Sequence, residues 1–128
     1  MNLNLNSLNL LDKIARFLLG LILIFSGVNY FLGILTWFEM TAEARNFIGA
    51  LLNANYIFPL VKSIEIVAGL LFLLNRFVVL ASLIIFPGII NILLFHAFLD
   101  FNGLYMAVLL IVLLSIIVVN RRSYFAFI

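Results

Sequence analysis

Apolar residues dominate the chain in four long runs, and short polar segments separate these runs. The runs cover residues 14–35, 57–74, 77–99 and 104–119. A helix needs about 20 apolar residues, each rising 1.5 Å, to cross the hydrocarbon core of a bilayer. The pattern therefore predicts an all-α fold, an integral membrane four-helix bundle that forms a single membrane domain over residues 1–128. The short links between the last three runs predict that these helices are antiparallel neighbours.

The connector between the first two runs has a helical pattern of its own. Thr41 is a suitable N-cap, and Glu43 follows in what would be the first turn. Apolar side chains then recur at helical spacing, at Phe47, Ile48, Leu51 and Leu52. We expect a short amphipathic helix over about 42–53, lying at the outer membrane interface.

The positive charges predict the orientation of the chain. Four spans place both termini on one side of the membrane, together with the Asn75-Arg76 turn. The basic residues of that side are Lys13, Arg16, Arg76, Arg121 and Arg122. The other side holds Arg45 among the acidic residues Glu39, Glu43 and Asp100. Cytoplasmic loops carry an excess of Lys and Arg, so we expect both termini in the cytoplasm.

Composition excludes several classes of protein. Of the 128 residues, 67% are hydrophobic and 9% are charged, and no soluble domain of this size could bury so much apolar surface. The lipid bilayer is therefore the expected partner, and the net charge of +2 predicts no nucleic-acid binding. The absence of cysteine excludes disulfides and thiolate chemistry, and one histidine with scattered carboxylates predicts no metal site.

Polar residues inside the apolar runs are the main candidates for function, because ionisable groups are costly in the bilayer. Lys62 and Glu65 are three residues apart on one helix face, and Gly69 on the same face would let a neighbouring helix approach. Matching depths across antiparallel helices places the polar groups in the outer half of the membrane. The predicted ligand pocket consists of Asn29, Lys62, Glu65, Asn91 and His96.

Each candidate also has a purely structural interpretation. Lys62 and Glu65 would form an internal pair that sets helix register, and His96 would bond Asp100 to close a turn. Ser26, which lies level with Glu65, would join helices by hydrogen bonds, as would Asn29 and Asn91. Two prolines have structural roles in either case: Pro59 suits the first turn of the second span, and Pro87 should kink the third or weaken one backbone bond.

Several short motifs resemble the DoxX family of small four-helix membrane proteins. They are Arg16-Phe-Leu-Leu-Gly20, Phe25-Ser-Gly-Val-Asn-Tyr-Phe31, Glu65-Ile-Val-Ala-Gly-Leu-Leu71 and Phe86-Pro-Gly-Ile-Ile-Asn-Ile-Leu-Leu-Phe-His96. The resemblance extends from about Arg16 to Met106, and it carries over Arg16, Gly27, Glu65, Gly69 and Arg76 as recurrent positions. One departure is Asn29, which stands where the family often has a lysine; Lys62 on the neighbouring helix would replace that charge.

The resemblance implies a role in membrane redox systems. The family is similar to the small subunit of thiosulfate:quinone oxidoreductase, and to a subunit that joins a secreted superoxide dismutase with a sulfurtransferase. The leading hypothesis is thus an inner-membrane accessory subunit of a redox complex, with membrane or periplasmic redox partners. Its pocket would hold a quinone headgroup or a partner's loop. The chain would carry no cofactor of its own and would not be a complete enzyme.

Two other hypotheses remain open. A small membrane protein with one embedded carboxylate is similar to the proton-coupled small multidrug resistance exporters, although their glutamate lies in the first helix. Glu65 lies in the second, beside Lys62, and a paired carboxylate is a poor cation trap. The third hypothesis is a structural membrane scaffold. The sequence does not identify the ligand or the partner proteins. It also leaves the oligomeric state open, with a homo-oligomer as one alternative.

Overall fold

The computed structural model describes residues 5–35 and 40–125, and these residues are almost wholly helical. The helices are α1 (Leu5–Leu32), α2 (Ala42–Asn53), α3 (Ile57–Leu74), α4 (Val78–Phe98) and α5 (Leu104–Asn120). Two 3₁₀ turns, η1 (Phe101–Gly103) and η2 (Arg122–Phe125), precede and follow α5. The described residues contain no strand.

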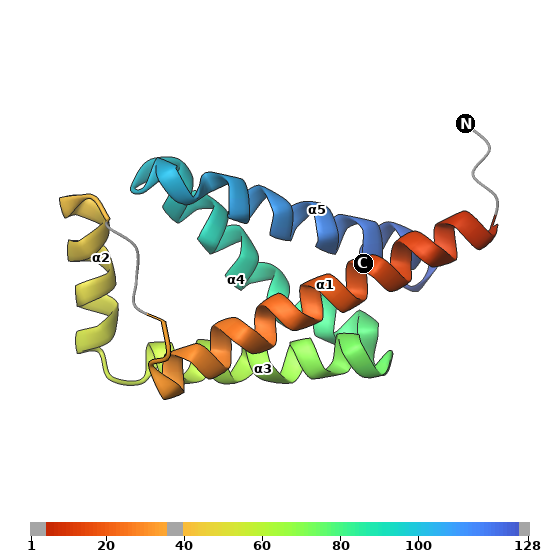
Figure 1. The fold of residues 1–128 in the computed structure, drawn as a ribbon, viewed down its shortest axis with the longest axis horizontal. Coiled ribbons are helices and arrows are strands. Elements are labelled where there is room, and N and C mark those ends of the chain that lie inside the picture. The colour runs from red at the N-terminus through yellow and green to blue at the C-terminus, as the bar shows by residue number, and fades with distance from the viewer. Residues whose placement is uncertain (1–4, 36–39, 126–128) are drawn as a thin grey trace.

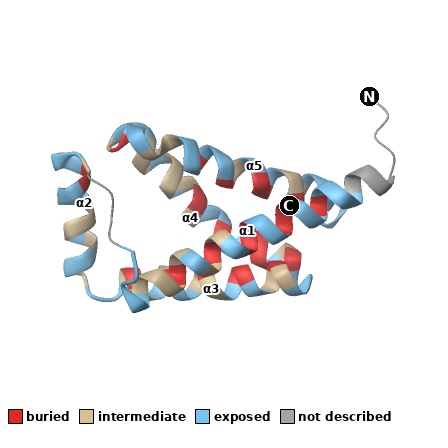
Figure 2. Cartoon of the chain, in the orientation of Figure 1, coloured by how far each residue is buried: buried red, intermediate tan, exposed pale blue. Residues whose placement is uncertain are grey.

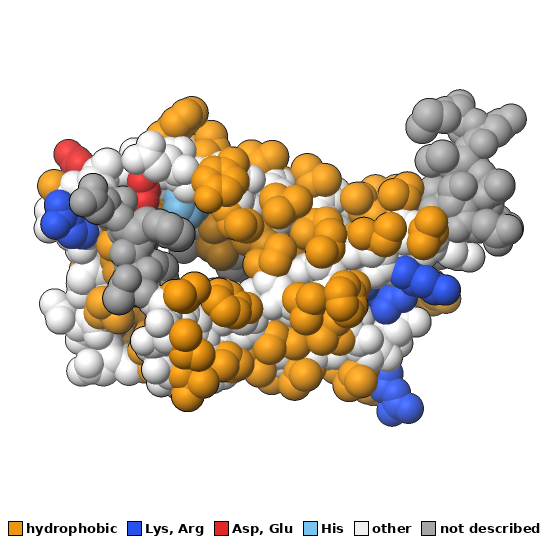
Figure 3. Space-filling model, in the orientation of Figure 1, with side chains coloured by type: hydrophobic (Ala, Val, Ile, Leu, Met, Phe, Trp, Pro, Cys, Tyr) orange, Lys and Arg blue, Asp and Glu red, His pale blue; other side chains and the backbone are white. Residues whose placement is uncertain are grey.

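Four of these helices are long and apolar enough to span a membrane. The candidate spans are Asn9–Leu32, Ile57–Leu74, Val78–Phe98 and Phe101–Asn120. Figure 1 shows α1 lying along α3, and α5 lying beside α4, while α2 lies across the end of the bundle that is remote from the N-terminus. In Figure 3 hydrophobic side chains cover the middle of the visible face, and charged groups lie toward its two ends. The fold is thus the predicted four-helix membrane bundle.

The core forms where the four spanning helices face one another. Its largest fully buried side chains are Leu19 and Leu23 of α1, Phe72 of α3, Ile89 of α4 and Ile117 of α5. Figure 2 shows buried residues on the inward faces and exposed residues on the outward faces. The exposed large side chains are mostly Leu, Ile, Val and Phe, as expected for a surface that meets lipid rather than water.

Three glycines let α1 and α3 approach each other closely. A Cβ atom added to Gly20 would lie 2.9 Å from the Gly69 carbonyl oxygen, and one added to Gly69 would lie 2.8 Å from the Gly20 carbonyl oxygen. A Cβ atom on Gly27 would meet Ile66 and lie 2.8 Å from the Lys62 carbonyl oxygen. Small residues at helix–helix contacts are typical of membrane bundles, and here they position the polar groups of α3 against α1.

The ends of α1 differ from the predicted span over residues 14–35. The helix begins at Leu5, in a segment of alternating Asn and Leu, and it ends at Leu32. Its C-terminal end is closed by Asn29, whose Oδ1 accepts from the Leu35 backbone N–H at 2.7 Å. Gly33 adopts a positive φ of 65°, which turns the chain out of the helix. Periodicity alone did not locate this stop because Ile34 and Leu35 are apolar.

Helix α2 covers Ala42–Asn53 and begins with a side-chain cap. Thr41 Oγ1 accepts from the Ala44 backbone N–H at 3.1 Å and donates to the Leu99 carbonyl oxygen, which ties the start of α2 to the end of α4. The location of α2 at the outer interface and the cytoplasmic orientation of the termini stay predictions. Glu39, one of the residues assigned to the outer side, lies outside the described residues.

The two prolines lie at different depths in their helices. Pro59 is in the first turn of α3 and accepts, through its carbonyl oxygen, a 2.7 Å hydrogen bond from Ser63 Oγ. Pro87 lies inside α4, which continues from Val78 to Phe98. Its side chain is exposed on the outward face of the helix, so the ring does not interrupt the core.

Candidate functional site

Lys62 and Glu65 form a buried ion pair on the inward face of α3. Lys62 Nζ lies 3.2 Å from Glu65 Oε2 and donates to Ser26 Oγ of α1 at 2.9 Å. Lys62 is only 7% exposed and Glu65 only 3% exposed, so the charges are withdrawn from the lipid-facing surface. We call Ser26, Lys62 and Glu65 the α3 cluster.

The sequence around the α3 cluster explains why it forms. Residues three apart on a helix share a face, so Lys62 and Glu65 can meet without any distortion of α3. Gly27 brings α1 against the Lys62 backbone, and this close approach places the adjacent Ser26 within reach of the ammonium group. The cluster offers an ammonium donor, a carboxylate acceptor and a hydroxyl group within one buried contact.

The other three residues of the predicted pocket have different surroundings. Asn29 bonds the Leu35 backbone through both its side-chain oxygen and its nitrogen, and so closes the end of α1. Asn91 is exposed on α4. The structure therefore brings Lys62 and Glu65 together with Ser26, a residue outside the predicted set, and it gives Asn29 the role of a local cap.

His96 belongs to the turn between α4 and α5. Its Nδ1 lies 3.0 Å from the Asp100 carbonyl oxygen, so Nδ1 carries the proton in this contact. The ring packs against Gly103, which has no side chain to exclude it. The contact matches the turn-closing interpretation of His96, with the Asp100 backbone rather than its carboxylate as partner. Asp100 Oδ1 is buried and has no hydrogen-bond partner among the described residues.

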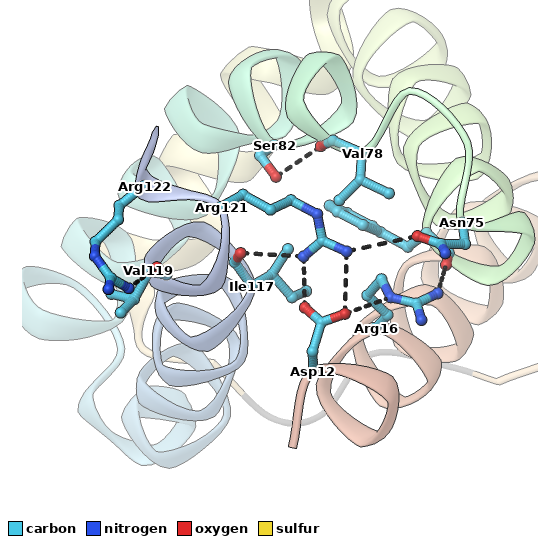
Figure 4. A network of polar contacts seen from close by, with 10 residues as sticks. Asp12, Arg16, Asn75, Val78, Ser82, Ile117, Val119, Arg121 and Arg122 are labelled. Carbon is cyan, nitrogen blue, oxygen red and sulfur yellow. Dashed lines mark hydrogen bonds and ion pairs between the residues drawn. The ribbon is translucent and has the colours of Figure 1, made fainter. Parts of the chain in front are cut away.

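A second buried cluster lies at the end of the bundle near the chain termini (Figure 4). Asp12 is at its centre, with Oδ2 2.9 Å from Arg16 Nε and 3.0 Å from Arg121 Nη2. Asp12 Oδ1 accepts a second bond, from Arg121 Nη1. Asp12 is 4% exposed and Arg16 is 9% exposed. We call Asp12, Arg16 and Arg121 the Asp12 cluster.

The Asp12 cluster joins three helices. Arg16 Nη1 of α1 donates to the Phe72 carbonyl oxygen of α3 at 3.1 Å. Arg121, which follows α5, bonds Asp12 of α1 and also donates to the Ile117 carbonyl oxygen at 3.2 Å. Both carbonyl groups lie in the last turns of their helices, where backbone partners are scarce, and the Phe72 oxygen also accepts from the Asn75 backbone N–H at 3.3 Å.

The charge pattern predicted that Arg16 and Arg121 lie on the same side of the membrane. It did not identify Asp12 as their partner. The available signal was the spacing of Asp12 and Arg16, which are four residues apart and therefore on one helix face. The predicted first span begins at residue 14, so Asp12 lies outside it and its pairing with Arg16 is not among the predictions. The bond to Arg121 has no sequence signal, since the two residues are 109 positions apart.

Two apolar grooves follow the lipid-facing sides of α5. The first, of about 370 Å³, has Leu11 of α1 on one side and ends at Asn120 and Arg122. The second, of about 310 Å³, has Ser82, Leu83 and Phe86 of α4 on its other side. Neither groove reaches Lys62 or Glu65. Within the part of the chain that the structure describes, no three His, Cys, Asp or Glu residues gather as metal ligands would.

Comparison with known proteins identifies a family. The family model described as DoxX matches residues 11–97, which include the α3 cluster together with Asp12 and Arg16. No curated protein and no solved structure gives a match.

Proposed function

The chain belongs to the DoxX family, and from this premise we propose that it is an inner-membrane accessory subunit of a redox complex. In this role the α3 cluster holds the headgroup of a quinone in the outer half of the bilayer. The observation that carries the proposal is the buried contact of Lys62 with Glu65 and Ser26, which lies well inside a spanning helix. Intramembrane ionisable residues are costly, and they commonly mark ligand or proton sites.

The side chains of the α3 cluster suit a quinone. Lys62 Nζ and Ser26 Oγ can donate to a carbonyl oxygen, and Glu65 can exchange a proton with a quinol hydroxyl group. A quinone bound here would take up electrons from a partner protein. For the headgroup to enter, Lys62 must leave Glu65. The lysine lies nearer the outer end of α3 and its long side chain can extend outward, whereas Glu65 lies almost one turn deeper.

The same contact makes the transporter hypothesis the weaker one. Glu65 already has a cationic partner on its own helix, so a cation would have to displace Lys62 before it could bind. The chain also contains no cysteine and a single histidine, a poor set for a redox centre. An accessory role, in which partners supply the electrons, fits these residues better than a complete enzyme does.

Mass spectrometry of the protein, extracted in mild detergent from its native membrane, tests the proposal. We expect stoichiometric quinone together with a co-purifying oxidoreductase or sulfur-handling protein. The variant Ser26→Ala should lower the bound quinone severalfold. Its matched control is Ser63→Ala, because Ser63 lies on the exposed face of α3 and bonds only its own helix.

The possible outcomes separate the alternatives. Equal quinone in Ser26→Ala and Ser63→Ala would reject the α3 cluster as the headgroup site. A redox partner without quinone would keep the accessory role and remove the quinone. A protein that carries bulk lipid alone, with neither quinone nor partner, would contradict the proposal and leave the scaffold and the transporter; a proton-flux assay would then separate those two.

A further inference from the structure

The first α5 groove has a basic side chain, Arg122, at its end, and the second has none. We propose that the first groove binds an anionic phospholipid, with one acyl chain along α5 and the phosphate at Arg122. The groove runs between the N-terminal part of α1, at Leu11, and the C-terminal half of α5. This inference does not depend on the proposed quinone site, which shares no residue with the groove.

The shape and lining of the groove suit an acyl chain. Its wall on α5 extends from Ile111 to Val119, which is about 12 Å at 1.5 Å per residue. The side chains along this length are apolar except for Ser115, whose hydroxyl group is already bonded to the Ile111 carbonyl oxygen. Because the groove lies on the outward side of a spanning helix, the molecules that meet it are lipids.

The charge at the end of the groove selects the headgroup. Arg121 and Arg122 are adjacent, but Figure 4 shows their side chains extending in different directions. Arg121 is committed to Asp12. Arg122 is exposed, and its one hydrogen bond within the described residues runs from Nη1 to the Val119 carbonyl oxygen at 3.0 Å. A guanidinium group has five N–H donors, so the remaining donors are available to a phosphate.

The position of Arg122 also fits lipid recognition. It follows the last residue of a candidate span, at the end where Lys13, Arg16, Arg76 and Arg121 gather. Basic pockets between transmembrane helices are typical binding sites for anionic headgroups. The second groove has a similar volume and no charged residue, and it therefore provides an internal comparison within the same protein.

Native mass spectrometry with defined lipids tests the inference. The purified full chain is equilibrated with phosphatidylglycerol and phosphatidylcholine of identical acyl chains, and the retention of each lipid is measured. We expect wild-type protein to retain phosphatidylglycerol preferentially. Arg122→Gln should weaken that retention about fivefold, the factor expected for one basic residue at an anionic surface. The matched control Arg76→Gln removes an exposed arginine at the same end of the bundle, outside the groove.

A second pair of variants tests the groove itself. Val112→Phe narrows the first groove and Leu83→Phe narrows the second, and both side chains are exposed, so neither change disturbs the core. Only Val112→Phe should reduce phosphatidylglycerol binding. Equal retention of both lipids by wild-type protein, or equal losses in Arg122→Gln and Arg76→Gln, would overturn the inference. So would an isoprenoid quinone that Val112→Phe displaces from the native extract.

Discussion

The two buried charge clusters connect the helices of the bundle in different ways. The Asp12 cluster joins residues 109 positions apart and links α1 to both α3 and α5. The α3 cluster is centred on two residues three apart on one helix, and Lys62 also bonds Ser26 of α1. The first cluster connects distant segments of the chain, and the second is centred on a local charge pair.

The clusters also differ in depth. Asp12 lies within one turn of Asn9, where the first candidate span begins. Glu65 lies eight residues after the start of α3, which is about 12 Å along the helix axis. A cluster near the membrane surface can join helices at modest cost, because water and headgroups are close. A deep ion pair must overcome a larger desolvation cost, and this difference favours a function for the α3 cluster beyond packing.

Removing the central carboxylate of the Asp12 cluster should have the largest effect on stability. Asp12→Asn leaves the guanidinium groups of Arg16 and Arg121 facing each other without a counter-charge, and Arg16 is buried. Breaking a buried charge network in this way costs about 3–5 kcal/mol. The free energy of unfolding, measured by denaturing-detergent titration in mixed micelles, should fall by that amount.

The control for this variant is Lys13→Gln, which changes an exposed charge on the next residue of α1. It should leave the unfolding free energy within about 0.5 kcal/mol of wild type. If Asp12→Asn proves as stable as Lys13→Gln, the cluster does not hold the three helices together.

Removing one charge of the α3 cluster should have an intermediate effect on stability. Glu65→Gln removes the carboxylate that pairs with Lys62, and we expect a loss of about 2.5–3.5 kcal/mol, the insertion cost of a charged group at the centre of a spanning helix. The double variant Lys62→Met/Glu65→Leu removes both charges and should lie within about 1 kcal/mol of wild type. Unfolding in mixed micelles measures both variants.

The double variant also distinguishes a functional role of the α3 cluster from a purely structural one. If it is stable but loses bound quinone or a redox partner, the α3 cluster serves function. If stability and all associations survive together, the cluster sets helix register alone. A double variant that is less stable than Glu65→Gln would show instead that the pair contributes net stability.

A change that forces α1 and α3 apart between the two clusters should lower the free energy of unfolding less than the Asp12 and Glu65 variants do. Gly69→Ala places a methyl group 2.8 Å from the Gly20 carbonyl oxygen, a backbone atom that cannot move unless the helices part. Overpacking of this kind costs about 1–2 kcal/mol. The control is Gly88→Ala in α4, where an added Cβ has no neighbour within 4 Å. That change should be neutral or slightly stabilising in unfolding assays, because alanine favours helix. A loss in Gly88→Ala equal to that in Gly69→Ala would contradict the close-approach explanation.

Local patterns in the sequence predicted much of the fold. The second, third and fourth spans were expected at 57–74, 77–99 and 104–119, and α3, α4 and α5 lie close to those ranges. The start and end of α1 were less predictable. Apolar side chains continue past Leu32, but the Asn29 cap and the positive φ of Gly33 end the helix there. Such caps depend on the path the chain takes next, and hydropathy does not report that path.

Two properties can be deduced from the sequence alone: the chain spans a membrane in four helices, and Lys62 and Glu65 share a helix face. Both follow from hydropathy and helical periodicity, which act over neighbouring residues. Three contacts become visible only in the folded bundle: Asp12 meets Arg121, Lys62 bonds Ser26, and Arg122 lies at the end of a groove. Those contacts depend on how closely α1 approaches α3 and on where α1 passes α5. Such distances are set by packing across the whole bundle, so no single segment encodes them.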